Sequence, residues 1–259
     1  MAEPDFDAAV QAFLRANVVP RRLREARVAE KLGAVDPVRV PSRWGELAAW
    51  RLGTGPAVLL VHGWEDDNSL WSPLIDELAS RQRALVAFDL PGHGASGGEW
   101  GLGWESADGM RAVAAALGPV DAVVAHSFGA GSALAAINEG LDVERAVLIA
   151  PPLGRGNRWR RYAERLGVSD DVAAAAQRIY EDAVGPHRVA LDTSDIARTL
   201  AIDLLFVHSR DDERNPFDKA TQIVPLSRRA ELFAVDGLNH RRTARDPDVV
   251  RRIAEFVTA

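Results

Sequence analysis

From residue 56 onward, short apolar runs alternate with stretches of helical periodicity, and this alternation limits the chain to few folds. It is the pattern of βαβ units, whose strands pair in parallel and are covered by helices on both faces. Segments 38–40 and 47–51 precede it and predict a hairpin at a sheet edge. The sequence thus predicts an α/β fold with a doubly wound, mostly parallel, eight-stranded sheet. The expected parallel strands cover residues 57–62, 84–88, 120–125, 146–150, 204–208 and 231–235, and the helices lie near 69–80, 105–117, 128–139, 217–224 and 246–257.

The domain organisation follows from what lies outside this alternation. Helical periodicity on both sides of Pro20 predicts an N-terminal helical segment over residues 1–36, with helices near 6–14 and 23–32. Roughly fifty residues separate the strands expected at 146–150 and 204–208, whereas such a connection typically takes ~2–6 residues. We therefore expect one core domain, residues 37–151 and 193–259, with a small helical cap inserted at 152–192.

Two helices are expected in this cap. Trp159, Tyr162 and Leu166 share one face of the first. Ser169 can cap the second, which ends at Gly185. The arginines at 155, 158, 160, 161 and 165 allow a substrate with an anionic group, although arginines on a short amphipathic helix more often form a solvated face. Trp159 and Tyr162 are the expected substrate-binding residues of the cap.

Charge and composition exclude several functions. The formal net charge is −6 and the basic residues are scattered, so nucleic acid is not an expected partner. The chain has no cysteine, which excludes disulfides and thiolate metal sites and fits a cytoplasmic location. The acidic N-terminus does not resemble a secretory signal, and no run of ~20 apolar residues predicts a membrane span. The expected partner is a small-molecule substrate, and the oligomeric state is not predicted.

The strongest chemical signal is the sequence Ala125-His126-Ser127-Phe128-Gly129, between an apolar strand and a helical stretch. A sharp strand-to-helix turn holds its central residue in a strained backbone conformation, which small neighbours two residues away tolerate. Ser127 is therefore the candidate nucleophile. The helix behind it directs unpaired amide N–H groups to where negative charge would develop.

Three further segments fall where such a nucleophile needs them. Gly63 and Trp64 follow an early strand, so the amides of Trp64 and Phe128 are the candidate oxyanion hole. Residues 209–216 follow another strand and contain several carboxylates that can reach a histidine. His240 follows the last strand, and its imidazole is the candidate base for Ser127.

These segments, together with the turn Asp89–Ser96, resemble the α/β-hydrolase superfamily over residues ~38–259. The resemblance implies a triad of Ser127, Asp212 and His240, because Pro216 aligns the acidic turn so that the acid is Asp212; Asp211 is the alternative. It also implies that His93 and His208 brace loops. From the residues themselves we expect that His62 braces its loop and that Asp66 and Asp67 cap the next helix. No metal or organic cofactor is expected, because no set of histidines and carboxylates has ligand spacing apart from the triad.

The expected activity is hydrolysis of a carboxylic ester through an acyl-enzyme intermediate. A serine nucleophile argues against epoxide hydrolases and haloalkane dehalogenases, which need aspartate there. Thioesterase, lactonase, amidase, perhydrolase and carbon–carbon bond hydrolase activities stay open, because one triad serves all of them. The alternative from another functional class is a receptor, which would keep the triad and bind a ligand but turn it over slowly or not at all. Tryptophans 64, 71, 100 and 104 are candidates for lining an acyl pocket.

Overall fold

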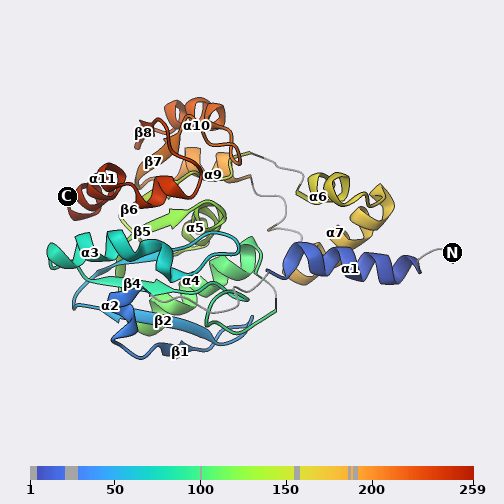
Figure 1. The fold of residues 1–259 in the computed structure, drawn as a ribbon, viewed down its shortest axis with the longest axis horizontal. Helices are drawn as coiled ribbons and strands as arrows, with labels where there is room; N and C mark the ends of the chain where they lie inside the picture. The colour runs from blue at the N-terminus through green and yellow to red at the C-terminus, as the bar shows by residue number, and fades with distance from the viewer. Residues whose placement is uncertain (1–4, 21–28, 100, 155–157, 186–187, 189–191) are drawn as a thin grey trace.

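A single eight-stranded sheet organises the computed structural model, which describes residues 5–20, 29–99, 101–154, 158–185, 188 and 192–259 (Figure 1). The strand order is β1-β2-β4-β3-β5-β6-β7-β8. The first two strands run antiparallel to their neighbours, and the other neighbours pair in parallel. The expected mostly parallel sheet with an edge hairpin is therefore confirmed. The strands are β1 Val38–Val40, β2 Leu47–Leu52, β3 Ala57–Val61, β4 Leu85–Phe88, β5 Val120–His126, β6 Arg145–Ile149, β7 Asp203–Ser209 and β8 Ala230–Val235.

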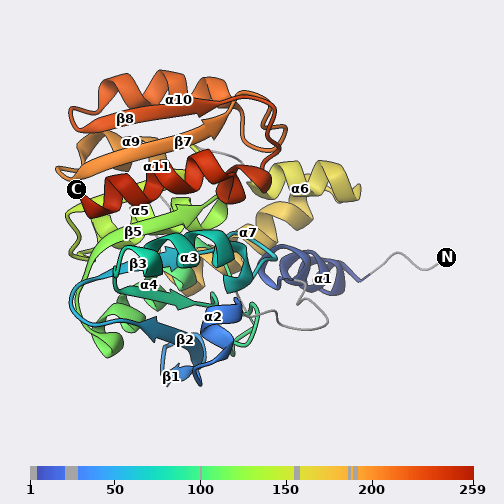
Figure 2. The same ribbon diagram turned by 60° about the vertical axis from the view of Figure 1, so that its left-hand side comes forward.

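Helices cover both faces of the sheet because its central strands are apolar on both sides. In β3, for example, Leu59 and Val61 face one layer, and Val58 and Leu60 face the other. Figure 2 shows α3 and α11 lying on the same face. That layer contains α2 (Glu30–Gly33), η1 (Asn68–Trp71), α3 (Ser72–Ser80), η3 (Arg242–Arg245) and α11 (Pro247–Thr258). The opposite layer contains α4 (Gly103–Leu117), α5 (Phe128–Asn138), α9 (Thr193–Thr199), α10 (Phe217–Ile223) and η2 (Val224–Leu226).

Local sequence explains the starts of several helices. The stretch expected as one helix over 69–80 begins as the 3₁₀ turn η1, where the carboxylate of Asp67 accepts a hydrogen bond from the amide of Ser69. Asp66 does not cap this helix, since its carboxylate pairs with Arg241. Ser169 precedes α7, but its side chain makes no capping bond. The sequence analysis missed α9, and most of the helix expected at 23–32 lies outside the described residues.

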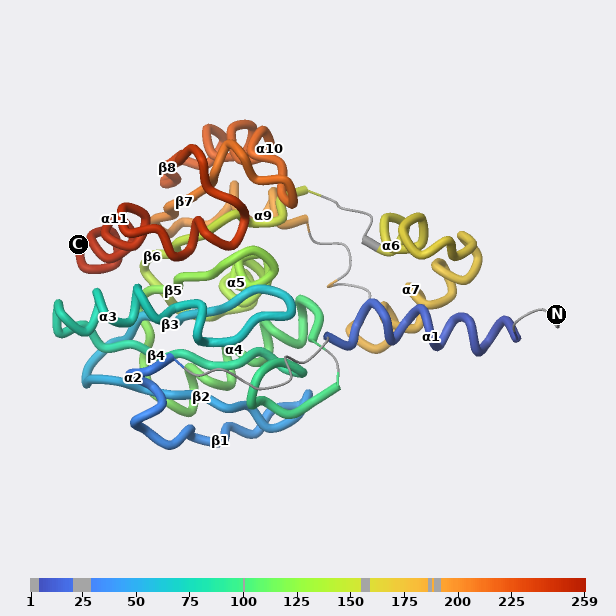
Figure 3. Tube along the Cα trace, in the orientation of Figure 1, coloured from blue at the N-terminus to red at the C-terminus, as the bar shows by residue number. Residues whose placement is uncertain are grey.

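Three helices lie to one side of the sheet and share a separate apolar cluster. These are α1 (Phe6–Val18), α6 (Arg158–Leu166) and α7 (Asp170–Val184) (Figure 3). Phe13 and Leu14 of α1 are buried with Trp159 of α6 and Tyr180 of α7. The N-terminal helix thus packs on the two inserted helices, a contact that the helical periodicity of either segment could not predict.

An ion-pair cluster ties the end of this helical group to the core. The Arg188 guanidinium donates hydrogen bonds of 3.1 and 2.9 Å to Asp108 on α4 and one of 2.8 Å to Glu139 beyond α5. Burial raises the pKa of Asp108, but the hydrogen bonds from Arg188, Trp44 and Arg111 outweigh it and leave that pKa below its usual value. The carboxylate therefore stays ionised, and Arg188, which follows α7 in the chain, is held against α4. No helix among the described residues is long and apolar enough to cross a membrane.

Candidate active site

A sharp turn joins β5 to α5 and carries Ser127. Its backbone angles are φ 51° and ψ −119°, a strained conformation for a residue with a side chain. The Ser127 amide donates a 2.8 Å hydrogen bond to the carbonyl oxygen of Ile149 on β6. A Cβ at residue 129 would lie 2.2 Å from the carbonyl oxygen of His62 and 2.9 Å from that of Val61. Gly129 is therefore required because α5 begins against the end of β3.

The Ser127 side chain begins a chain of hydrogen bonds through three residues that are distant in sequence. Its Oγ lies 2.7 Å from Nε2 of His240, and Nδ1 of the same ring lies 2.7 Å from Oδ2 of Asp212. Ser127 follows β5, Asp212 follows β7, and His240 follows β8, so parallel pairing places all three at the carboxyl edge of the sheet. The arrangement can transfer a proton from a hydroxyl to an imidazole held by a carboxylate.

Of the two adjacent carboxylates in the acidic turn, Asp212 is the one that contacts His240. Its Oδ1 accepts hydrogen bonds of 2.8 and 3.0 Å from the amides of Arg214 and Asn215. Burial raises the pKa of Asp212, but hydrogen bonds to the carboxylate more than compensate and lower its pKa well below the usual value. His208 also faces this carboxylate: its Nε2 lies 3.5 Å from Oδ2 of Asp212 and 2.9 Å from the Asn215 carbonyl oxygen.

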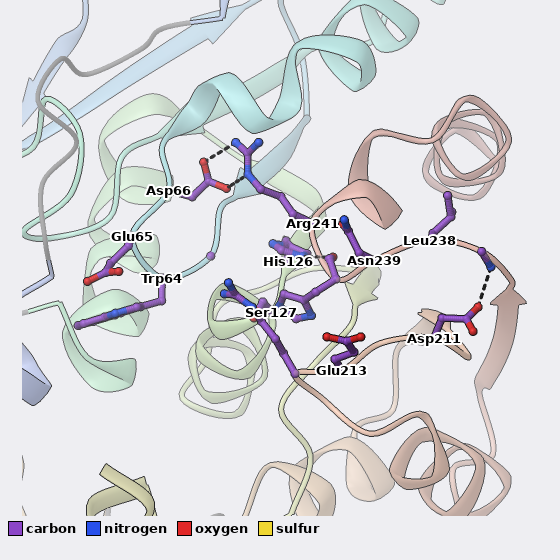
Figure 4. A pocket seen from close by; sticks show the side chains of 14 residues that line it. Trp64, Glu65, Asp66, His126, Ser127, Asp211, Glu213, Leu238, Asn239 and Arg241 are labelled. Carbon is purple, nitrogen blue, oxygen red and sulfur yellow. Dashed lines mark hydrogen bonds and ion pairs between the residues drawn. The ribbon is translucent and has the colours of Figure 1, made fainter. Parts of the chain in front are cut away.

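Asp211 faces away from this chain of hydrogen bonds. Its Oδ2 accepts a 2.7 Å hydrogen bond from the amide of Gly237, as Figure 4 shows. That contact joins the acidic turn to the loop before His240. The alternative acid considered in the sequence analysis thus lies at the cavity wall without a hydrogen bond to the imidazole.

His126, next to the turn, is buried against the His240 loop. Its Nε2 lies 3.0 Å from the His240 carbonyl oxygen, and the centroids of the His126 and His240 rings are 4.9 Å apart. Burial, together with the nearby His240 ring, lowers the pKa of His126 to about 4. The ring is therefore neutral at physiological pH, and its Nε2–H donates to the carbonyl oxygen. The sequence analysis gave this residue no role.

The loop after β3 approaches Ser127 closely at Gly63. A Cβ on Gly63 would lie 3.1 Å from Nδ1 of His126 and 3.4 Å from the Ser127 Cβ. The rings of Trp64 and Phe128 meet edge to face with centroids 5.4 Å apart, so the two expected oxyanion-hole residues are neighbours. Phe128 is the first residue of α5, and its amide therefore has no carbonyl partner within that helix.

Two polar residues brace this loop from behind. Nε2 of His62 accepts a 3.0 Å hydrogen bond from the Leu90 amide, and its Nδ1 lies 2.8 Å from the Gly63 carbonyl oxygen. Asp66 accepts two 2.8 Å hydrogen bonds from the Arg241 guanidinium, which links the β3 loop to the residue after His240 (Figure 4). This ion pair could not be predicted from local sequence patterns, because 175 residues separate its partners.

Two cavities meet at Ser127 and Trp64, which line both of them. The first, of about 770 Å³, is lined by His240 and by more carboxylates than cations; its charged residues are Glu65, Asp66, Asp211, Glu213, Arg214 and Arg241 (Figure 4). The second, of about 570 Å³, is lined mainly by apolar groups and by three cations; its residues include Phe128, Pro151, Pro152, Leu153, Tyr162, Arg161, Arg165 and Lys219.

The two expected cap residues lie in different surroundings. Tyr162 lines the second cavity, and the Arg165 guanidinium stacks on its ring at 4.1 Å. Trp159 is buried against Phe13 and Tyr180 and lines neither cavity, which favours a packing role. Of the other tryptophans, Trp64 lines both cavities, whereas Trp71 and Trp104 pack on the helical layers; Trp100, like Arg155, lies outside the described residues.

No group of three or more histidine or carboxylate side chains in the described part of the chain has the geometry of a metal site.

Known proteins are similar to this chain in sequence or in architecture. A superfamily protein of Bacillus subtilis, YisY, is 25% identical in an alignment of 232 positions that covers 73% of this chain and 86% of that protein. A pimeloyl-[acyl-carrier protein] methyl ester esterase of Xanthomonas campestris is 34% identical over 116 residues, 44% of this chain and 45% of its own. A Pyrococcus furiosus esterase structure superposes with a TM-score of 0.72 at 18% identity, covering 93% of this chain and 97% of the other.

The sequence profile of the alpha/beta hydrolase family matches residues 58–253, which contain the elbow at Ser127, the acidic turn and His240. The chain belongs to the alpha/beta hydrolase family.

Proposed function

We propose that the protein hydrolyses carboxylic esters of small molecules through an acyl-enzyme intermediate. One observation carries the proposal: Ser127 Oγ, the His240 ring and the Asp212 carboxylate are connected by two hydrogen bonds of 2.7 Å at the meeting point of two cavities. The Xanthomonas relative, named for a methyl ester substrate, supports an ester over the other acyl bonds.

In the proposed acylation step, Ser127 Oγ attacks the ester carbonyl carbon while its proton passes to Nε2 of His240. The carbonyl oxygen becomes an oxyanion that accepts hydrogen bonds from the amides of Trp64 and Phe128. The carbon–oxygen bond to the alcohol then breaks, and His240 returns the proton to the departing oxygen. Asp212 holds the ring through Nδ1 and stabilises the imidazolium.

In the proposed deacylation step, water attacks the acyl-enzyme carbonyl and gives its proton to His240. Collapse of the second oxyanion releases the carboxylic acid and returns the proton to Ser127. The sum of both steps is one ester and one water converted to one alcohol and one acid. We further propose that residues 152–192 act as a cap over this reaction.

The test combines covalent labelling with turnover. A fluorophosphonate probe is expected to label Ser127, located by peptide mass spectrometry, and short-chain nitrophenyl esters are expected to turn over many times. Ser127→Ala should abolish labelling and lower kcat by ~10⁴ or more. Ser132→Ala is the matched control, because Ser132 is a buried serine on α5 whose hydroxyl donates to the Phe128 carbonyl oxygen.

Two outcomes would contradict the proposal. Esterase activity that survives in Ser127→Ala would show that another group is the nucleophile. Tight ligand binding without turnover, across a panel of esters, thioesters, lactones and amides, would instead support the receptor alternative.

A further inference from the structure

The position of His240 assigns the two cavities to the two halves of an ester. In the proposed mechanism, the oxygen of the alcohol must receive a proton from Nε2 of His240. His240 lines the first cavity and is absent from the lining of the second. The alcohol therefore departs into the first cavity, and the acyl chain extends from Ser127 into the second.

The second cavity combines an apolar wall with three positive charges. Phe128, Pro152, Leu153 and the Tyr162 ring provide surface for an aliphatic chain. Arg161 and Arg165 come from α6, and Lys219 comes from α10. The cations thus belong to two elements that are far apart in sequence and face one space.

Carboxylates in the described part of the chain leave these three cations unpaired. Among those residues, none with a carboxylate lines the second cavity, and none forms an ion pair with Arg161, Arg165 or Lys219. Arg161 and Arg165 are four residues apart on α6, where like charges destabilise a helix. Arg160 on the same helix behaves differently, because its guanidinium pairs with Glu164 at 2.9 Å.

The first cavity has the opposite charge. Its lining contains the carboxylates of Glu65, Asp66, Asp211 and Glu213 and only two cations among the described residues. These cations are Arg214 and Arg241, and Arg241 is paired with Asp66. Fields of opposite sign on the two sides of Ser127 favour one orientation of a substrate with a single negative end. The negative end would lie in the second cavity and a neutral alcohol in the first.

We propose, on the basis of the ester hydrolysis proposed above, that the natural substrate is a monoester of an aliphatic dicarboxylic acid. Its free carboxylate binds Arg161, Arg165 and Lys219, its methylene chain lies along the apolar wall, and its ester carbonyl reaches Ser127. Hydrolysis then releases the diacid and a neutral alcohol, so this site serves a step that removes an ester from one end of a dicarboxylate.

The experiment compares two substrates that share a leaving group, 4-nitrophenyl hydrogen adipate and 4-nitrophenyl hexanoate. The wild-type kcat/KM is expected to be about tenfold or more higher for the adipate ester, as hydrogen bonds to a charged group imply. In Lys219→Gln, and in the double variant Arg161→Gln/Arg165→Gln, the adipate-to-hexanoate ratio should fall toward one, mainly through a higher KM for adipate. Arg160→Gln is the matched control and should keep the wild-type ratio.

The outcomes separate this inference from the proposed function. Rapid hydrolysis of both esters at equal kcat/KM, with ratios indifferent to Lys219→Gln and the double variant, would overturn the dicarboxylate substrate and leave ester hydrolysis intact. Failure to turn over either ester, in a protein that the fluorophosphonate does not label, would overturn the proposed function itself. Raising KCl from 50 to 500 mM should lower the wild-type ratio, because salt screens exposed charges.

Discussion

Replacing Asp212 with asparagine removes one charge and almost no volume, and the structure determines how the new amide must sit. Oδ1 of Asp212 accepts hydrogen bonds from the amides of Arg214 and Asn215, and Oδ2 contacts His240. An NH₂ group in the Oδ1 position would face two backbone donors, and leaving such groups unpaired costs ~1–3 kcal/mol each. The amide nitrogen of the variant therefore takes the Oδ2 position.

That orientation gives His240 the wrong tautomer. The amide NH₂ donates to Nδ1 of His240, so the ring proton moves to Nε2, which then cannot accept the proton of Ser127. Loss of a triad carboxylate in this way lowers kcat by ~10⁴, equivalent to ~5 kcal/mol at the transition state. We expect a loss of that size for Asp212→Asn with little change in KM.

The assay is initial-rate hydrolysis of a nitrophenyl ester, with ¹⁵N NMR of labelled histidine to identify the protonated ring nitrogen. Asp211→Asn is the matched control, because Asp211 accepts a hydrogen bond from Gly237 and does not contact the ring; we expect kcat within about threefold of wild type, since its amide oxygen can still accept that bond. Circular dichroism checks that both variants are folded. A large kcat loss in Asp211→Asn alone, or an unchanged tautomer in an inactive Asp212→Asn, would refute the reasoning.

Three other predictions concern groups around the site and the separate helical cluster. His126 has its pKa lowered to about 4 from an ordinary 6.5, so the unfolded chain binds a proton between those values that the folded chain does not. Stability should fall by about 3 kcal/mol as pH drops from 6.5 to 4, and urea unfolding of His126→Gln should lack that part of the dependence. Gly129→Ala should lower the free energy of unfolding by ~1–3 kcal/mol and remove most of the activity, because the new Cβ would push α5 away from β3. Gly33→Ala is the control: its Cβ would meet no atom within 4 Å, so stability and activity should not fall. Trp159→Ala should lower the free energy of unfolding by ~3–5 kcal/mol, because packing on Phe13 is lost. Chemical denaturation measures this change. A loss of activity at unchanged stability would indicate instead that Trp159 contacts the substrate.

The sheet and the position of the candidate site could both be predicted from the amino-acid sequence. Runs such as Ala57–Val61 are buried on both faces, so their composition alone indicates a parallel strand. The elbow at Ser127 was visible because a strained turn needs small neighbours at defined spacing. The positions of Ser127 and His240 at strand ends then follow, since parallel strands end at one edge.

Features that depend on contacts between distant segments could not be predicted in this way. Asp211 and Asp212 are adjacent and chemically equivalent, and their spacing left Asp211 open as the alternative. In the structure Asp212 contacts the His240 ring, whereas Asp211 accepts a hydrogen bond from Gly237. The docking of α1 on α6 and α7 required facing apolar surfaces whose pairing no local periodicity encodes. The positive charge of the second cavity also depends on distant segments, because Arg161 on α6 and Lys219 on α10 line one cavity only in the folded protein. Local patterns encode elements, whereas the fields and contacts that select a substrate arise from where those elements converge.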